Sequence, residues 1–285
     1  MGDPDLPKKS EVRELAPGVF QFIKANGSWN SGFIITSAGV AVVDAMLTPA
    51  WARRVREKIR ERTDKPVRYL LITHRHSDHY FGAQVFVPPA ELIAHASVRE
   101  YYSKNVKREF AFRRRISPKA DLSEVVVRLP SITVEGPRTT LYLGDTEIQL
   151  LHFGPGQTPG ALFIYLPKEK VMYTGDTFNR KSINFMANAT SIDGWLSILD
   201  KIKAMDVKVY AGGHGIPAVK SDIEGAKRFI RAMVKGVKGA IADGLTVNQA
   251  VQKLTFPEFR QWRNYDRFIH RNIKGLYKRF QKKGG

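Results

Sequence analysis

The 285-residue sequence contains no cysteine. This absence excludes disulfide bridges, thiolate nucleophiles and zinc sites built from cysteine, so any metal ion must be held by histidine, carboxylate or amide side chains. It also removes the cysteine usage from which an oxidising or reducing compartment is usually inferred. The compartment therefore stays open between the cytoplasm and, where a leader has been removed, the periplasm.

Long apolar runs are also missing. A membrane-spanning helix needs about 18 or more consecutive apolar residues, and charged or turn-forming residues interrupt every candidate segment. The first nine residues carry no apolar stretch after their charges, which is not typical of a signal peptide. With 43% hydrophobic residues the chain is too apolar to be disordered, so we expect a folded globular protein without a membrane span.

Acidic residues are scarce relative to basic ones. The chain has 46 Lys and Arg against 27 Asp and Glu, a net charge of +19. Residues 99–119 carry a net charge of +6 and residues 220–285 one of +11, so these two segments hold most of the excess. They are either the solvated faces of helices or a field that attracts anionic substrates or a polyanion, and the sequence leaves both interpretations open.

The first half of the chain has the pattern of strands with one helix. Residues 19–23, 32–36 and 40–43 predict an antiparallel meander, and Thr48-Pro49 predicts the start of a helix that ends near residue 62. Residues 67–72 have the apolar pattern of a buried strand and lead directly into Thr73-His74.

The β pattern resumes after a basic helical stretch at 97–115. The predicted strands are 139–143, 146–151, 161–166, 171–174 and 207–211, with a helix at 192–205 and mostly helix beyond. No segment is rich enough in Pro, Gly or Ser to divide the chain. We therefore expect one domain over 1–285, with a core at about 15–218 and a basic helical portion at about 219–285.

Three of the seven histidines fall in one six-residue window, as His74, His76 and His79, together with Asp78. Imidazoles two residues apart just after a strand can converge on one cation, and the aspartate and histidine that follow can address a second position nearby. Histidine and aspartate also cap loops, but four such groups crowded together would be awkward without a cation. The window therefore predicts a two-metal cradle.

Two further candidate ligands follow predicted strands. Asp176 comes directly after Gly175, and His214 lies between Gly213 and Gly215. Glycine beside a ligand allows close backbone approach and unusual dihedral angles. Each residue alone would be interpreted as an ordinary turn or loop residue; combined with the window at 74–79, both are predicted ligands.

The order of these motifs resembles the metallo-beta-lactamase fold superfamily of hydrolases, which includes beta-lactamases, glyoxalase II, lactonases, alkylsulfatases and RNase Z. The resemblance covers about residues 15–218. It implies an α+β fold, a four-layered αβ/βα sandwich with metals at one edge, followed here by the helical C-terminal portion.

The resemblance also implies the role of each residue. His74 and His76 would hold one metal, Asp78, His79 and His214 would hold the second, and Asp176 would bridge the two. Asp44, which ends a predicted strand, would support the cluster from behind. Asp78 would also orient a metal-bound hydroxide and accept a proton, which makes Asp78 and Asp176 the candidate catalytic residues.

Position 157 departs from the family pattern. The family has Pro-Gly-His-Thr-x-Gly where this chain has Pro-Gly-Gln-Thr-Pro-Gly, so Gln157 replaces an imidazole of the first metal site. An amide oxygen is a weaker and harder ligand, which lowers zinc affinity or favours a harder cation such as Mn or Fe. We expect Gln157 to bind directly; a single-metal site or complete loss of metal chemistry are the alternatives. His152, His95 and His270 are expected to be structural.

The resemblance and the ligand types together predict a zinc-dependent hydrolase, similar to beta-lactamases, with one or two Zn²⁺ ions. A metal-bound hydroxide would attack a small-molecule ester, amide or lactone, β-lactams included. One alternative is a phosphodiesterase or nuclease acting on anionic substrates, and another is a non-catalytic binding protein on the same scaffold. Nucleic acid is the less favoured partner, because basic residues interleaved with aromatics are also typical of amphipathic helices. The substrate and the oligomeric state stay open.

Overall fold

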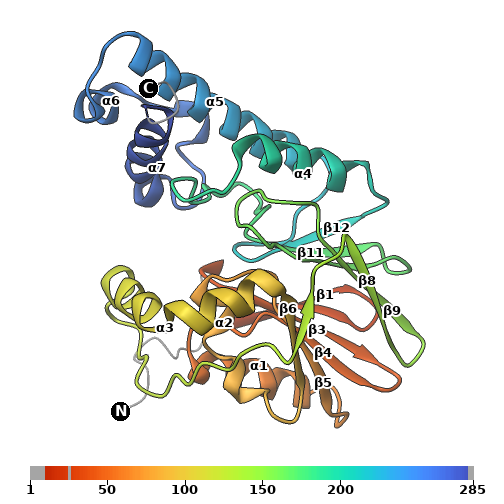
Figure 1. Cartoon of the computed structure of the whole chain (residues 1–285). Helices are drawn as coiled ribbons and strands as arrows, with labels where there is room; N and C mark the ends of the chain where they lie inside the picture. Colours follow the sequence, from red (N-terminus) through yellow and green to blue (C-terminus); the bar gives the residue numbers. More distant parts are fainter. Residues whose placement is uncertain (1–9, 25–26, 282–285) are drawn as a thin grey trace.

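The computed structural model describes residues 10–24 and 27–281, which form two β-sheets with helices on their outer faces (Figure 1). This arrangement confirms the α+β fold class predicted from the sequence. The first sheet has the strand order β1 (Ser10–Ala16), β2 (Val19–Lys24), β3 (Asn30–Thr36), β4 (Gly39–Val43), β5 (Val67–Leu71), β6 (Glu91–His95) and β7 (Ile132–Val134). The second has the order β12 (Val209–Gly212), β11 (Val171–Gly175), β10 (Phe163–Leu166), β9 (Thr146–Leu151) and β8 (Arg138–Leu143).

Helices cover both sheets from outside. In chain order the helical segments are α1 (Pro49–Arg60), α2 (Ser77–Tyr80), η2 (Ala83–Val85), α3 (Ala96–Ile116), α4 (Ile192–Ala204), α5 (Asp222–Ala242), α6 (Val247–Lys253), η3 (Pro257–Phe259) and α7 (Tyr265–Gln281). In Figure 1, α1 and α3 lie on the first sheet, and α4 and α5 lie on the second. None of the helices within the described ranges is long and apolar enough to cross a bilayer.

Three apolar layers hold this sandwich together. Successive side chains of a strand point to opposite faces of its sheet, and β4 shows the result: Val42 packs in the layer beneath α1, and Val43 packs between the two sheets. The third layer lies between the second sheet and the C-terminal helices, and contains Trp195 of α4 and Phe229 of α5. Each sheet is therefore buried on both faces, which explains why all five residues of β4 are buried.

The carboxyl ends of four strands meet at one edge of the sandwich. β4 runs parallel to β5 in the first sheet, and β11 runs parallel to β12 in the second. The loops that follow these strands begin at Asp44, Ile72, Asp176 and Gly213. This topology brings together the four segments that the sequence motifs singled out.

The C-terminal helices add a lobe beside this edge. α5 packs against α4, α6 and α7, and α7 buries one apolar stripe that includes Ile269, Ile273 and Leu276. The opposite face of α7 carries its basic residues. The sequence predicted this helical portion but gave no indication of where it lies relative to the motifs.

Most predicted elements are found within one to three residues of their expected bounds. α1 begins at Pro49 with the Thr48 hydroxyl accepting a hydrogen bond from the Trp51 N–H, as Thr48-Pro49 predicted, and it ends at Arg60. The sequence patterns did not predict β1 and β7. Half-buried β1 carries charges at three of its seven positions, and β7 has only three residues, so neither shows a clear alternation of apolar side chains.

Candidate metal centre

The histidine window lies in the loop and short helix that follow β5. His74 comes three residues after the strand ends, and His79 lies in α2 with its side chain fully buried. His76 precedes α2 and is partly exposed. The ring centroids of His74 and His79 are 4.5 Å apart, and so are those of His74 and His76. The three imidazoles therefore converge, as the sequence spacing predicted.

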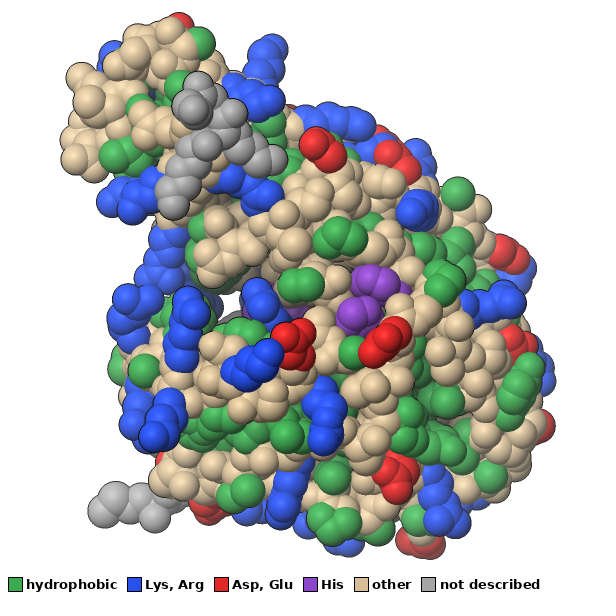
Figure 2. Space-filling view, viewed as in Figure 1, with side chains coloured by type: hydrophobic (Ala, Val, Ile, Leu, Met, Phe, Trp, Pro, Cys, Tyr) green, Lys and Arg blue, Asp and Glu red, His purple; other side chains and the backbone are tan. Residues whose placement is uncertain are grey.

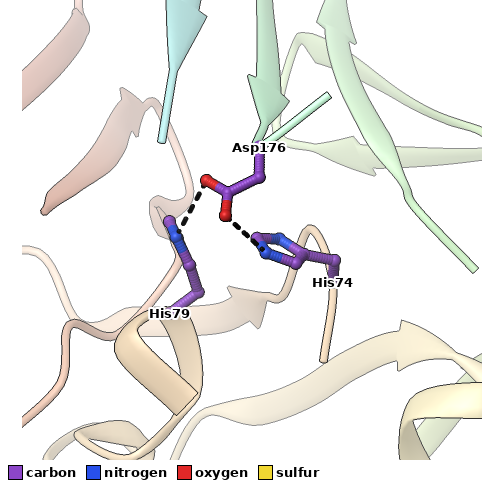
Figure 3. Close-up of side chains that lie close together, drawn as sticks. All are labelled: His74, His79 and Asp176. Atoms are coloured by element: carbon purple, nitrogen blue, oxygen red, sulfur yellow. Dashed lines mark ion pairs between the residues drawn. The ribbon is translucent and has the colours of Figure 1, made fainter. Parts of the chain in front are cut away.

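Asp176 lies at the centre of this group, between His74 and His79 (Figure 3). Its Oδ2 is 3.3 Å from His74 Nε2 and 3.1 Å from His76 Nδ1. Its Oδ1 is 3.3 Å from His79 Nε2 and 3.0 Å from His214 Nε2. One carboxylate oxygen thus faces the first pair of histidines and the other faces the second pair.

His214 comes from the loop after β12, in the other sheet. Its Nε2 lies 3.7 Å from Asp78 Oδ2, and its ring centroid is 5.3 Å from that of His79. Potential ligand atoms form two groups, and within each group all of them lie within 4.8 Å of one another. The first group is His74, His79 and Asp176, and the second is Asp78, His79 and His214. His79 belongs to both groups.

Unsatisfied buried atoms show that the cluster fits a cation. His74 Nε2, His79 Nε2 and Asp176 Oδ1 are buried and have no partner in hydrogen-bond geometry among the described residues. Such atoms are costly to bury unless they bind something. Imidazole nitrogens with carboxylate oxygens are a ligand set suited to zinc and neighbouring divalent metals. The residues present therefore fit the metal that their types predict.

Hydrogen bonds behind the histidines point the free ring nitrogens inward. Asp44 Oδ2 is 2.9 Å from His79 Nδ1, and its Oδ1 accepts from the Thr73 N–H at 2.8 Å. The Thr73 hydroxyl donates to Asp44 and lies 2.9 Å from His74 Nδ1. His214 Nδ1 lies within hydrogen-bond distance of the Ser28 carbonyl. We assign a ring proton to each of these three Nδ1 atoms, which turns each Nε2 toward the cluster.

Two glycines allow the two sheets to approach each other here. A Cβ on Gly175, whose φ is +49°, would lie 2.5 Å from Thr73 Oγ1. A Cβ on Gly213 would lie 2.5 Å from His79 Cε1 and 2.8 Å from Asp176 Oδ1. Any larger residue at either position would push the ligand loops apart, which explains the glycines beside Asp176 and His214.

The environment sets the charge of these groups. Burial lowers the pKa of His74 to about 4, reinforced by His79 and His76 and opposed by Asp176. Burial acts in the same direction on His79, but the carboxylates of Asp176 and Asp44 outweigh it and raise its pKa well above the ordinary value. Burial would raise the pKa of Asp176, but His214, His79 and His74 hold it well below the usual range. At neutral pH, His74 is thus a neutral ligand and Asp176 a carboxylate.

Asp78 is held by a basic side chain that the sequence analysis did not identify. Arg113 of α3 donates to Asp78 Oδ1 at 2.5 Å and to Ser77 Oγ at 2.8 Å. Ser77 in turn donates to Glu109, one turn earlier on α3. Burial opposes ionisation of Asp78, but Arg113, His79 and His214 lower its pKa below the usual range. Arg113 stands in a run of three arginines, and only the packing of α3 distinguishes it from the other two.

Gln157 is 5% exposed and lines the same cavity as His76 and Asp176. The His152 ring instead lies beside that of His95, tilted relative to it, with the ring centroids 4.4 Å apart. Its Nδ1 lies 3.1 Å from the Ala161 carbonyl oxygen. His95 caps α3 by accepting from the Ser97 N–H. His270 lies on the exposed face of α7. The structural roles expected for His152 and His95 agree with these contacts.

A cavity of about 870 Å³ opens onto the cluster, and basic side chains dominate its walls. The basic residues that line it are Arg75, Arg108, Arg113, Arg115, Arg263, Arg267, Arg271, Lys274 and Lys278. All but Arg75 come from the two basic segments of the sequence, and most of them lie on α3 and α7, which Figure 1 shows one above the other on the same side of the molecule. Figure 2 shows blue Lys and Arg side chains above and below a hollow on this side.

Most of these cations have no acidic partner among the residues that the structure describes. Within the described part of the chain only Arg113 among the nine makes an ion pair, the one with Asp78. The acidic residues of the lining are Asp78, Glu109 and Asp176, and contacts described above occupy all three. Eight basic residues of the two segments thus form one positive wall of the cavity, and the other described basic residues of these segments lie outside its lining.

Aromatic side chains of these segments divide between core and cavity. Phe110 stacks on Phe81 in the interior, and Phe259 packs against Phe229. Phe112 and Phe268 instead line the cavity between the cations. The interpretation that these aromatics pack inward is therefore right for Phe110 and Phe259, but it does not describe Phe112 and Phe268.

Comparison with protein families gives one match that covers most of the sandwich. The family model of the metallo-beta-lactamase superfamily matches residues 27–214, from the loop before β3 to His214. This range includes every ligand candidate described above.

Similar proteins include enzymes with named substrates. The chain is 27% identical over 213 residues to the 2,4-dinitroanisole O-demethylase subunit alpha of Nocardioides sp., covering 73% of this chain and 56% of that protein. It is 23% identical over 261 residues to a linear primary-alkylsulfatase of Pseudomonas sp., covering 77% and 48%. A stereoselective inverting sec-alkylsulfatase of Pseudomonas sp. has a similar structure, with a TM-score of 0.78 at 18% identity, over 95% of this chain and 50% of that one. The chain thus spans about half the length of the curated relatives it matches.

Proposed function

The chain belongs to the metallo-beta-lactamase superfamily, and from this premise we propose that it is a metal-dependent hydrolase of small anionic esters, with organic sulfate monoesters as the substrate class. This substrate class is narrower than the ester, amide or lactone expected from the sequence. It also gives the two basic segments a role in the reaction.

The observation that carries this proposal is the set of eight cavity cations without an acidic partner in the described part of the chain. A neutral lactam or carboxylate ester would leave these charges without a counterpart. A sulfate monoester brings a permanent negative charge beside the bond to be cleaved, and a positively lined cleft raises its local concentration. The aromatic rings of Phe112 and Phe268 between the cations would contact the organic group.

The relatives support the same class. Of the two curated relatives described above, one is named an alkylsulfatase, and the other is named for 2,4-dinitroanisole, an uncharged aryl ether. Because the chain matches only about half of each, their substrates indicate a class to test rather than an assignment. An aryl ether therefore belongs in the substrate panel as the uncharged alternative.

The metal ligands follow from the geometry of the cluster. In this proposal His74, His76 and Gln157 would hold a first ion, Asp78, His79 and His214 would hold a second, and Asp176 lies beside both sets of ligands. A divalent ion bound there supplies hydroxide at neutral pH and polarises the ester. Zinc is the ion that the four imidazoles favour, and the amide of Gln157 favours a harder ion at the first position.

Asp78 acts as a ligand rather than as a base in this proposal. Arg113 occupies its Oδ1, and the low pKa of its carboxylate makes it a weak proton acceptor. In this reaction hydroxide would attack sulfur, the S–O bond to the alcohol would break, and the alcohol would leave with a proton from solvent, while the positive wall would hold the sulfate. Among the cations of α7, Arg267 interacts electrostatically with Asp78, and both line the cavity.

A phosphodiesterase is the second candidate, because the same positive wall would hold a phosphodiester. A non-catalytic binding protein remains the alternative if the ligands bind no ion.

A panel of matched chromogenic substrates separates these functions. The metal-loaded protein is assayed with 4-nitrophenyl sulfate, bis(4-nitrophenyl) phosphate, 4-nitrophenyl acetate, a chromogenic β-lactam and 4-nitroanisole. We expect the sulfate to give the highest kcat/KM and chelation to abolish its turnover. Faster turnover of the phosphodiester would favour the second candidate, and turnover that survives chelation would contradict a metal-dependent hydrolase.

A further inference from the structure

The exposed face of α7 carries four basic side chains in a single stripe. Arg267, Arg271, Lys274 and Lys278 are spaced four, three and four residues apart, which places them on one side of a helix. All four are exposed and all four line the cavity. At about 1.5 Å per residue the stripe extends for roughly 16 Å, about three turns.

The two ends of the stripe have different surroundings. Burial lowers the pKa of Arg267, and Asp78 opposes this effect, so Arg267 interacts electrostatically with the metal loop. Lys278 lies three turns further along α7. The segment after Asp176 runs alongside α7 in the same direction, because the Ile183 N–H donates to the Arg263 carbonyl and Arg279 donates to the Ala189 carbonyl, so the stripe leads away from Asp176.

The stripe carries more charge than one sulfate monoester requires. A sulfate monoester has a single negative charge, and the α3 wall already offers Arg108 and Arg115 without an acidic partner in the described ranges. Neighbouring like charges on a helix are destabilising unless an anion lies between them. Arg279 on the same helix shows the contrast, because its guanidinium donates to the carbonyls of Ala189 and Thr190 instead of facing the cavity.

We propose that Lys274 and Lys278 form a second anion subsite, which binds an anionic group of the substrate remote from the ester that is cleaved. Cleavage of such a substrate rests on the proposed function, but binding of the second anionic group to Lys274 and Lys278 does not. The substrate class is then an organic sulfate ester with a second sulfate, phosphate or carboxylate. That second group lies about 10 to 16 Å from Arg267, the distance along the helix to Lys274 and Lys278.

The test compares sulfate esters of equal length. Monosulfates of linear alcohols of about ten carbons, long enough to reach from Arg267 to Lys274, are prepared with a hydroxyl, a carboxylate, a phosphate or a sulfate at the far end. We expect a charged far end to lower KM about fivefold relative to the hydroxyl, which corresponds to two exposed ion pairs, while kcat stays unchanged. The far-end anion that gives the lowest KM identifies the chemical class of the second group.

A matched pair of double variants locates the effect. Lys274→Gln with Lys278→Gln is expected to remove the difference in KM between esters with a charged far end and the ester with a hydroxyl far end, whatever change in KM is common to all four esters. Arg231→Gln with Lys235→Gln on α5 removes the same charge from exposed positions outside the cavity and is expected to preserve this difference. Circular dichroism of both variants checks that the helices are intact.

Two results would overturn the subsite. One is an equal loss of this difference in KM in both double variants, because the net charge rather than α7 would then be responsible. The other is hydrolysis of all four esters with the same KM, which would leave the proposed function standing. If the metal-loaded protein hydrolyses none of the esters, the proposed function fails, and calorimetry with the bis-sulfate then tests the subsite: binding that the α7 variant weakens supports it, and absence of binding refutes it.

Discussion

At the scale of single residues, Asp44 orients residues of the cluster although it is not itself a proposed ligand. Its backbone adopts a left-handed conformation, with a φ of 59°, directly after β4. In this conformation its carboxylate reaches both Thr73 and His79. Strained residues of this kind commonly occur at functional sites. One carboxylate thus fixes the orientation of two proposed ligand rings.

Asp44→Asn tests this role with little effect on the backbone, because asparagine tolerates the left-handed region. The amide cannot accept hydrogen bonds on both sides as the carboxylate does. We expect zinc affinity to fall about 10- to 100-fold, measured by competition with a chromogenic chelator. Equal affinity in the variant and the parent protein would show that Asp44 does not orient His79.

Gln157 is the residue at which this chain departs from the family pattern. Restoring the imidazole with Gln157→His is expected to raise zinc occupancy at the first position, because imidazole binds zinc better than an amide does. Gln157→Ala is the matched control, which should lower it. Metal stoichiometry determined on both variants is the measurement. A stoichiometry that neither variant changes would remove Gln157 from the ligand set.

The residue types of the cluster could be predicted from the sequence, and Asp44 behind them from the resemblance, but the supports Ser28 and Arg113 could not. His74, His76, Asp78 and His79 fall in one window, so their proximity needs no tertiary information. The contact between His214 and Ser28 joins residues far apart in sequence, and it exists only because β12 and the segment before β3 meet at the same edge. Serine in a loop carries no signal of that pairing.

At the scale of elements, α3 is fixed to the metal loop by a buried polar network. Arg113 is 4% exposed and Glu109 is 7% exposed, and with Ser77 and Asp78 they join the middle of α3 to α2. Tyr101 adds a hydrogen bond to the second oxygen of Glu109 at 2.7 Å. The network is satisfied on every side, so removing one cation would leave buried carboxylates without a counterpart.

Arg113→Met should therefore destabilise the protein by about 3–5 kcal/mol, the usual cost of breaking a buried ion pair on one side. Arg114→Met is the control, since Arg114 is exposed and its substitution should change stability by no more than about 0.5 kcal/mol. Urea denaturation of both variants gives the free energies of unfolding. A loss below about 1 kcal/mol for Arg113→Met would show that the pair is not needed to hold α3.

Elements with strong periodicity or clear capping residues were predictable, and marginal ones were not. α1 has an N-cap threonine, a proline at its start and an apolar stripe, so local signals alone define it. β1 is an edge strand whose extended conformation depends on pairing with β2. Its charged side chains protect an exposed edge and hide the strand pattern at the same time.

At the scale of the whole molecule, the fold brings two basic segments more than 100 residues apart to one cavity. The net charge of +19 is visible in the sequence, but its convergence is not, because it depends on how the C-terminal lobe, which packs on the second sheet, lies relative to α3. The sequence therefore left a solvated surface and an anion-attracting field equally open. The positions of α3 and α7 favour the field.

This convergence predicts a strong salt dependence. Raising ionic strength from about 0.01 M to 0.15 M shortens the Debye length from about 30 Å to about 8 Å, which screens the outer cations from an approaching anion. We expect KM for an alkyl sulfate to rise several-fold over this range. KM for any uncharged ester that the protein accepts provides the control and should hardly change. A sulfate KM that is independent of salt would contradict the role of the positive wall.

The account depends most on His79 as a ligand of a divalent ion in this cluster. Elemental analysis of the protein, equilibrated with zinc and then freed of excess, measures this directly. We predict one to two bound ions per chain for the parent protein. The number should fall to below half of this in His79→Ala. It should stay unchanged in the control His270→Ala, because His270 lies on the surface of α7. A parent protein that binds no ion, or an equal content in His79→Ala and the parent, would contradict the account.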